Sequence, residues 1–232
     1  MPLPLHTALE RRRSTIDEAF RAFVGAPDFP CLAGKGILRS QSYALGVFGA
    51  LGTEHSASAL AVELARFVRQ LPADGAGLHA FVAVFPERVM TDEIAFERAL
   101  WRQLQLLHAH DELGAEWDPT VSADPESAQF SFSFASRALF VVGMHPASSR
   151  LSRRFTWPTL VFNPRAQFER LRAEGKFERL RTMVRERDVA LQGTVNPSLA
   201  DFGERSEARQ YSGRVTEPEW RCPFHQRANN DE

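Results

Sequence analysis

The residues best suited to chemistry lie between Gly143 and Arg154, a stretch that reads Gly-Met-His-Pro-Ala-Ser-Ser-Arg-Leu-Ser-Arg-Arg. Its histidine, His145, can offer a neutral imidazole nitrogen to a transition metal. Three arginines follow it closely, and guanidinium groups bind carboxylates or phosphates through paired donors. The combination suggests a site for an anionic cofactor that carries a metal.

Both features also have a purely structural interpretation. His145 fits equally a packed histidine that bonds to the backbone, and arginines are common as surface charge. Between His145 and Arg187 the chain has ten Arg and one Lys against four Glu. This local positive excess favours an anionic partner, although a solvated helix face has the same composition.

Length and composition limit the class of protein. A chain of 232 residues with 44% hydrophobic content can bury one substantial core, so we expect a single domain over residues 1–232. The formal net charge of -1 argues against a general nucleic-acid binder, which needs an overall surplus of Lys and Arg.

We expect a soluble, cytoplasmic protein with no membrane partner. No apolar run approaches the roughly 18 residues that span a bilayer, and the first residues lack the order of a secretory signal. Cys31 and Cys222 are far apart in the sequence, so a reducing cytosol would keep them as thiols. Neither has the paired spacing of a zinc site.

Hydrophobic periodicity predicts helices at 14–23, 56–70, 91 to about 113 and 165–189, and strands at 43–48, 79–85, 129–135, 138–144 and 159–162. Gly175 should bend or divide the last helix. The adjacent strands 129–135 and 138–144 should form an antiparallel hairpin with one face buried, because phenylalanines alternate with serines. Residues 192–224 should be mostly irregular. The order of elements favours an α+β fold, a mainly antiparallel sheet packed with helices.

Seven blocks of the sequence, taken in order, resemble a known family. The blocks are Phe29-Pro-Cys31, His145-Pro-Ala-Ser-Ser-Arg-Leu-Ser-Arg-Arg154, Val161-Phe-Asn-Pro-Arg-Ala-Gln-Phe-Glu169, Arg187-Asp-Val-Ala-Leu-Gln-Gly193, Asn196-Pro197, Ser206-Glu-Ala-Arg-Gln-Tyr-Ser-Gly213 and Trp220-Arg-Cys-Pro-Phe224. They are similar to the YqcI/YcgG family, and among its members to the haem-dependent N-hydroxylases of guanidine compounds. The resemblance runs from about Phe29 to Phe224.

The resemblance implies a monooxygenase that contains haem b and uses dioxygen to hydroxylate a guanidino nitrogen of arginine or an arginine-like amino acid. An external reductase or other electron donor is then needed, since the chain has neither a Gly-x-Gly-x-x-Gly fingerprint nor a cysteine cluster. Two alternatives are a non-catalytic haem sensor or carrier and a non-haem protein whose arginines bind a phosphorylated ligand.

His145 is the preferred iron ligand. It directly follows the predicted strand 138–144, and Pro146 stiffens the backbone after it. Cys31 and Cys222 remain alternatives, since thiolate ligation favours cleavage of the O–O bond. Arg150, Arg153, Arg154 and Arg165 are the expected partners of the two haem propionates.

A guanidinium substrate requires a planar anionic acceptor, and Glu207 is the preferred carboxylate, with Asp188 and Glu204 in reserve. Each of these acids could instead pair with an arginine of the chain. Tyr211 and Gln210 could donate hydrogen bonds to bound oxygen or to the amino-acid end of the substrate, and Tyr211 could equally pack in the core.

Overall fold

The computed structural model describes residues 5–111, 115–198 and 202–226. In chain order its elements are α1 (Leu5–Gly25), α2 (Leu32–Ser40), β1 (Tyr43–Val47), α3 (Glu54–Gln70), β2 (Ala80–Val84), α4 (Glu93–His110), β3 (Phe132–Phe134), β4 (Arg137–Met144), the 3-10 turn η1 (Leu151–Arg153), β5 (Thr159–Pro164), α5 (Arg165–Ala173), α6 (Phe177–Gln192) and α7 (Ala208–Tyr211).

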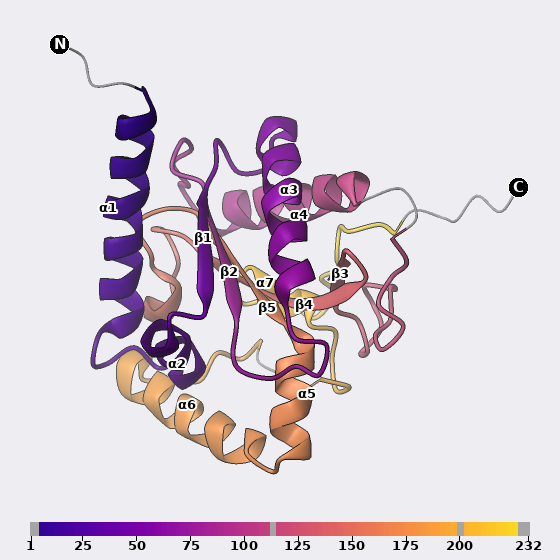
Figure 1. The fold of residues 1–232 in the computed structure, drawn as a ribbon. Coiled ribbons are helices and arrows are strands. Elements are labelled where there is room, and N and C mark those ends of the chain that lie inside the picture. The colour runs from indigo at the N-terminus through magenta and orange to yellow at the C-terminus, as the bar shows by residue number, and fades with distance from the viewer. Residues whose placement is uncertain (1–4, 112–114, 199–201, 227–232) are drawn as a thin grey trace, which may run out of the picture.

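The described strands form one five-stranded sheet in the order β1-β2-β5-β4-β3 (Figure 1). Only β1 and β2 pair in parallel, and the other neighbours are antiparallel. The prediction of an α+β fold with a mainly antiparallel sheet is therefore confirmed. The antiparallel hairpin of β3 and β4 and the division of the last long helix at Gly175 are confirmed as well.

Both faces of the sheet are covered, and alternation along the strands decides which side chain goes where. In β2, Phe81 and Ala83 pack with α3 and α4 in the larger core cluster. Their neighbours Val82 and Val84 join a second cluster built on α1. Figure 1 shows α1 at the left of the sheet, with α2 and α6 below it.

Some sequence predictions were wrong in detail. Helix α2 was not predicted, because Gly34 and Gly36 weaken the helical pattern. The hairpin has both faces buried rather than one, since Ser133 is 1% exposed and its hydroxyl accepts a hydrogen bond from the Asp118 amide. Helix α4 ends at His110, and Leu113, where we expected its end, lies outside the described residues.

Glycine is required at one point where β4 meets its neighbours. A Cβ atom at Gly143 would lie 2.7 Å from both a ring carbon of Phe96 and the carbonyl oxygen of Tyr211. The close approach lets α4 and the segment around α7 pack directly on the end of β4, immediately before His145.

Candidate functional site

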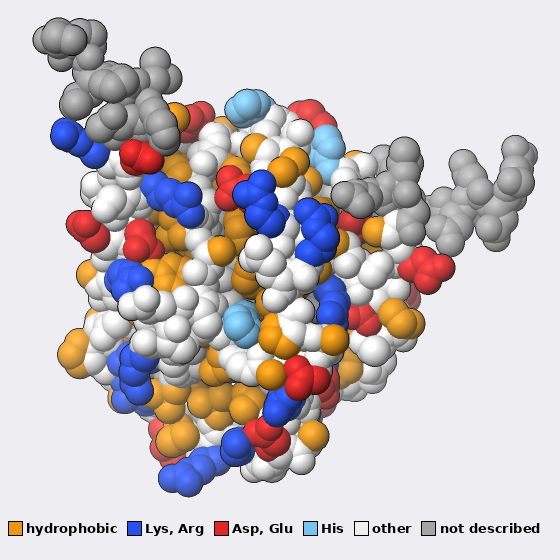
Figure 2. All heavy atoms as spheres, viewed as in Figure 1, with side chains coloured by type: hydrophobic (Ala, Val, Ile, Leu, Met, Phe, Trp, Pro, Cys, Tyr) orange, Lys and Arg blue, Asp and Glu red, His pale blue; other side chains and the backbone are white. Residues whose placement is uncertain are grey.

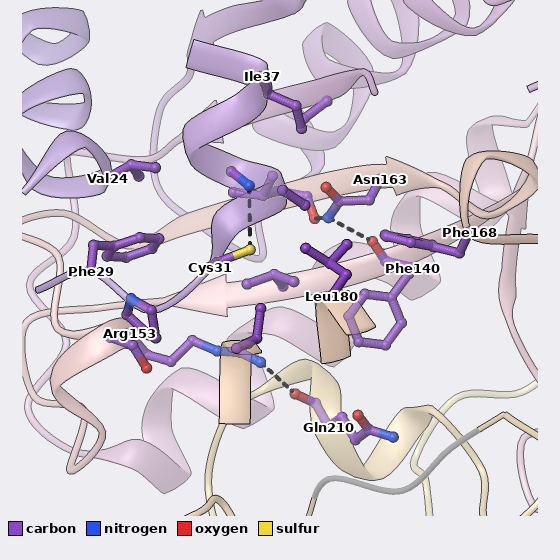
Figure 3. Close-up of a pocket in the computed structure, with 18 of the residues that line it drawn as sticks. Val24, Phe29, Cys31, Ile37, Phe140, Arg153, Asn163, Phe168, Leu180 and Gln210 are labelled. Atoms are coloured by element: carbon purple, nitrogen blue, oxygen red, sulfur yellow. Dashed lines mark hydrogen bonds between the residues drawn. The ribbon is translucent and has the colours of Figure 1, made fainter. Parts of the chain in front are cut away.

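A cavity of about 360 Å³ opens between one face of the sheet and helices α2 and α6. Volumes of this size are typical of small-molecule sites. Its floor consists of alternate residues from three strands: Ala80 and Val82 of β2, Phe140, Val142 and Met144 of β4, and Val161 and Asn163 of β5. Figure 3 shows Phe29, Cys31 and Arg153 on one side of the cavity and Phe140 and Phe168 on the other.

Helix α6 turns its apolar stripe to this cavity instead of packing on the sheet. Phe177, Leu180 and Val184 all line the cavity and are only half-buried. Near the C-terminal end of the helix, Asp188 pairs with Arg150, and Gln192 accepts a hydrogen bond from the Leu151 amide at 2.8 Å. The cavity therefore has an apolar wall whose packing a ligand would complete.

Cys31 presents its thiol to the cavity from the start of α2. It is the N-cap residue of that helix, and its Sγ accepts a hydrogen bond from the Gly34 amide at 3.3 Å (Figure 3). Burial raises the pKa of the Cys31 thiol, while the Gly34 and Ala33 amides and the charge of Arg153 oppose that rise. Among the described residues that line the cavity, Cys31 is the sole cysteine or histidine.

Arg153 is a cavity arginine whose guanidinium donates hydrogen bonds to backbone carbonyl groups. Its guanidinium donates to the carbonyl oxygens of Gly143 at 3.0 Å and of Tyr211 and Gln210 at 3.4 Å each. Burial lowers the pKa of Arg153 to about 10, so the group remains a cation at neutral pH. Among the described residues no carboxylate forms an ion pair with Arg153, although the nearby charge of Asp188 raises its pKa. An anionic group on a ligand could form such a pair.

Two other cavity arginines are already paired. Arg150 binds Asp188 and also donates to the carbonyl oxygen of Thr194 at 2.8 Å. Arg165 binds Glu207 through Nη1 and Glu169 through Nη2, at 2.6 Å for the second. All four partners of the Arg150–Asp188 and Arg165–Glu207 pairs are buried, and such pairs are strongly destabilised when one member is lost.

Glu207 keeps one oxygen less engaged than the other. Its Oε1 takes the bond from Arg165, whereas its Oε2 lies 3.5 Å from the Tyr211 hydroxyl, the outer limit of a hydrogen bond. Burial raises the pKa of the Glu207 carboxyl, and the charge of Arg165 works in the opposite direction. The carboxylate, which belongs to a residue that lines the cavity, thus has remaining acceptor capacity at Oε2.

The arginines of the positive segment divide into two groups in the structure. Some of its arginines line the cavity: Arg150, Arg153, Arg165, Arg172, Arg181 and Arg185. Others form surface pairs, such as Arg170 with Glu174 and Asp74. Figure 2 shows Lys and Arg side chains interspersed with Asp and Glu along the lower edge, in the region of α5 and α6.

Comparison with known proteins identifies the family of this chain. The sequence profile of the YqcI/YcgG family matches residues 20–225. The chain belongs to the YqcI/YcgG family. One similar protein is the uncharacterized protein YqcI of Bacillus subtilis (strain 168). The two sequences are 28% identical over 206 residues, which cover 84% of this chain and 80% of that protein. No solved structure matches the chain.

In this YqcI/YcgG protein, His145 lies outside the cavity. It is fully buried and stacks on Phe96 of α4, with ring centroids 4.2 Å apart, on the opposite face of the sheet. Neither ring nitrogen has a hydrogen-bond partner within the described part of the chain. Burial lowers the pKa of His145 to about 4, so the imidazole is neutral at physiological pH. The expected grouping of His145 with the cavity arginines is not formed.

Four further predicted residues also lie away from the cavity. Arg154 is exposed and bonds to the carbonyl oxygens of Ser148 and Ser149. Tyr211 is packed in the larger core, where its hydroxyl accepts a hydrogen bond from the Phe132 amide at 3.0 Å. Cys222 is buried in the same core, and Glu204 is exposed. By contrast Arg150, Arg153, Arg165, Asp188, Glu207 and Gln210 do meet at the cavity.

Sequence reasoning missed two contributions to the site. One is the apolar stripe of α6, which was recognised as helical but gave no sign that it faces a cavity. The other is Asn163, which was interpreted as the end of a strand and in fact lies within β5 on the cavity floor. A polar residue inside a strand was the available signal.

Within the residues that the structure describes, no helix is long and apolar enough to cross a membrane. The same residues include no group of three or more His, Cys, Asp or Glu side chains placed to hold a metal ion.

Proposed function

We propose that this protein is a haem-dependent monooxygenase that N-hydroxylates the guanidino group of arginine or of an arginine-like amino acid. The observation that carries the proposal is the cavity itself: its walls are mainly apolar, and a thiol, an arginine with only neutral partners and a partly engaged carboxylate all face it. An apolar ring system with anionic arms and an iron atom matches that combination of groups.

Cys31 is the residue of the cavity that fits an iron ligand. His145, the residue preferred from the sequence, lies on the other face of the sheet, and Cys222 is in the core behind that face. A thiol at a helix N-cap, with backbone amides and Arg153 nearby, is placed where its thiolate form is favoured once a metal supplies further positive charge.

Arg153 is the first candidate for a haem propionate, with Arg172, Arg181 and Arg185 on α5 and α6 as further cations of the wall. Arg150 and Arg165 are less suited, because each already holds a buried carboxylate. When bound, haem supplies the activation of dioxygen that N-hydroxylation requires. The protein contributes ligation, orientation and a wall of apolar side chains that excludes competing water.

The substrate's guanidinium needs a negative partner, and Glu207 supplies one through Oε2. Arg165 can keep its ion pair with Glu169 while Glu207 accepts a hydrogen bond from the guanidinium of the substrate. Gln210 lines the same cavity and suits the polar end of an amino acid. In the overall reaction one oxygen atom enters an N–H bond and the other leaves as water. An external reductase provides the two electrons, and solvent provides two protons.

The same structure gives one reason to consider a haem carrier or sensor without catalysis. Both carboxylates of the cavity, Asp188 and Glu207, are bound to arginines of the chain itself. If those pairs stay closed, the cavity holds a cofactor and lacks a free acceptor for a guanidinium substrate.

The deciding experiment is aerobic turnover of the haem-reconstituted protein with a reductant and a panel of guanidino compounds, with products analysed by mass spectrometry. We expect one compound to gain a single oxygen atom on a guanidino nitrogen. Haem retention without any product or any substrate-induced change in the Soret band would favour the carrier. A protein that binds no haem would refute the proposal.

A further inference from the structure

Asn163 is a polar side chain in the middle of an apolar floor. It belongs to β5, and the floor residues around it from β2, β4 and β5 are Ala80, Val82, Phe140, Val142, Met144 and Val161. Asparagine is a poor strand former, and a polar group in an apolar surface lowers stability unless it is hydrogen-bonded. Local rules of this kind are broken most often at functional sites.

The amide of Asn163 is held in one orientation. Its Nδ2 donates to the carbonyl oxygens of Phe140 at 3.2 Å and of Val161 at 3.3 Å (Figure 3). Turning the amide over would place an oxygen against those two carbonyl oxygens, which cannot donate. The Oδ1 atom is therefore fixed as an acceptor, and within the described chain it accepts no hydrogen bond.

Asn163 stands at the end of the cavity where Glu207 lies. It pairs with Phe140 across the sheet, and the Phe140 ring is in edge contact with the ring of Tyr211, whose hydroxyl lies 3.5 Å from Glu207 Oε2. Two residues further along the chain, Arg165 binds Glu207. A ligand group held by Glu207 thus lies near a second, neutral acceptor on the floor.

We propose that Asn163 Oδ1 accepts a hydrogen bond from an N–H of the bound ligand and selects a guanidino group over a ureido group of the same shape. This inference rests on the proposed function and adds to it the residue that determines specificity. The guanidinium of arginine offers five N–H donors, and both of its terminal nitrogens carry them. A ureido group replaces one of them by an oxygen, which faces Oδ1 as acceptor against acceptor.

The test measures binding by calorimetry on the haem-loaded protein, with L-arginine and with its ureido counterpart L-citrulline as probes. The variants are Asn163→Leu, which removes the acceptor, and Asn163→Thr, which suits a strand and offers a hydroxyl that can both donate and accept. We expect wild type to prefer arginine. In Asn163→Leu the arginine affinity should fall by about 10- to 100-fold, with a much smaller change for citrulline. Asn163→Thr should bring the affinities for arginine and citrulline closer together.

Gln103→Met is the matched control, because it removes a buried side-chain amide from the other side of the sheet, where Gln103 Oε1 accepts from the Gly52 amide. It should reduce stability and leave the preference unchanged. Equal losses for both probes in Asn163→Leu, or an unchanged preference in Asn163→Thr, would overturn the inference and leave the proposed function standing. Failure of wild type to bind any guanidino compound would overturn both.

Discussion

Met144 and His145 are neighbours in the chain and lie on opposite faces of the sheet. Met144 lines the cavity at the end of β4, whereas His145 stacks on Phe96 of α4. Because side chains alternate along a strand, no small shift of the backbone brings both into one site. If the proposed haem binds in this cavity, we expect its iron ligand to be a residue other than His145, and Cys31 is the candidate that lines the cavity.

Replacing Cys31 should remove haem, and replacing His145 should not. We expect Cys31→Ala to lose the Soret band of the reconstituted protein, and wild type to give a thiolate-type spectrum with carbon monoxide. His145→Phe preserves the stacked ring on Phe96 and should keep the Soret band. The reverse result, with haem lost only in the His145 variant, would return the ligand to His145. Circular dichroism of each variant shows whether the fold is intact.

His145 should make stability depend on pH. Burial lowers its pKa from 6.5 to about 4, with Glu93 and Asp92 raising it and Arg153 lowering it further. The unfolded chain thus takes up a proton before the folded protein does. Stability is fully present above pH 6.5 and falls by about 3 kcal/mol as the pH drops toward 4.

Urea unfolding of wild type and His145→Phe at several pH values between 4 and 7 measures this contribution. The variant should lose less stability over that range than wild type does. If the free energy of unfolding depends on pH in the same way for both proteins, burial does not lower the pKa of His145.

Arg153 and Arg154 are adjacent and should differ in their effect on cofactor affinity. Arg153 faces the cavity with carbonyl partners only, and Arg154 is exposed. A charge-assisted bond to a propionate contributes roughly 1.5–3 kcal/mol, so Arg153→Gln should weaken haem binding by about one to two orders of magnitude. Arg154→Gln should leave it unchanged. Competition for haem with apomyoglobin gives both affinities, and equal values would exclude Arg153 from the propionate site.

The Arg165–Glu207 pair should be coupled in folding. Arg165→Met leaves a buried carboxylate without its main cation, and we expect the free energy of unfolding to fall by about 3–5 kcal/mol at neutral pH. The double variant Arg165→Met/Glu207→Leu should recover most of that loss. A double-mutant cycle in urea measures the coupling, and additive losses would mean that the two residues act independently.

The pH profile of Arg165→Met gives a second check. Burial already raises the pKa of Glu207, and removing Arg165 takes away the charge that opposes this rise. With a folded-state pKa above the unfolded value, the variant is relatively more stable at low pH and loses stability as the pH rises through the pKa of Glu207. The difference in the free energy of unfolding between wild type and Arg165→Met should therefore be smaller in mild acid than at neutral pH.

The sequence by itself determined the elements and the family. The stripe of α3, the apolar run of β2 and the division at Gly175 follow from local periodicity and from backbone preferences, which act over a few residues. Seven short blocks in order were enough to identify the YqcI/YcgG family, which the profile match over residues 20–225 confirms. Only α2, whose two glycines weaken its pattern, was missed among the longer helices.

Only the tertiary structure decided which of the chemically suitable residues share a site. His145, Arg153 and Arg154 belong to one sequence block, yet one is buried under α4, one faces the cavity and one faces solvent. Arg165 and Glu207 are 42 residues apart and are joined in a buried ion pair. Residue type and spacing state what a side chain is able to do. Its face of the sheet, its burial and its long-range partners depend on how the elements pack, which local sequence does not encode.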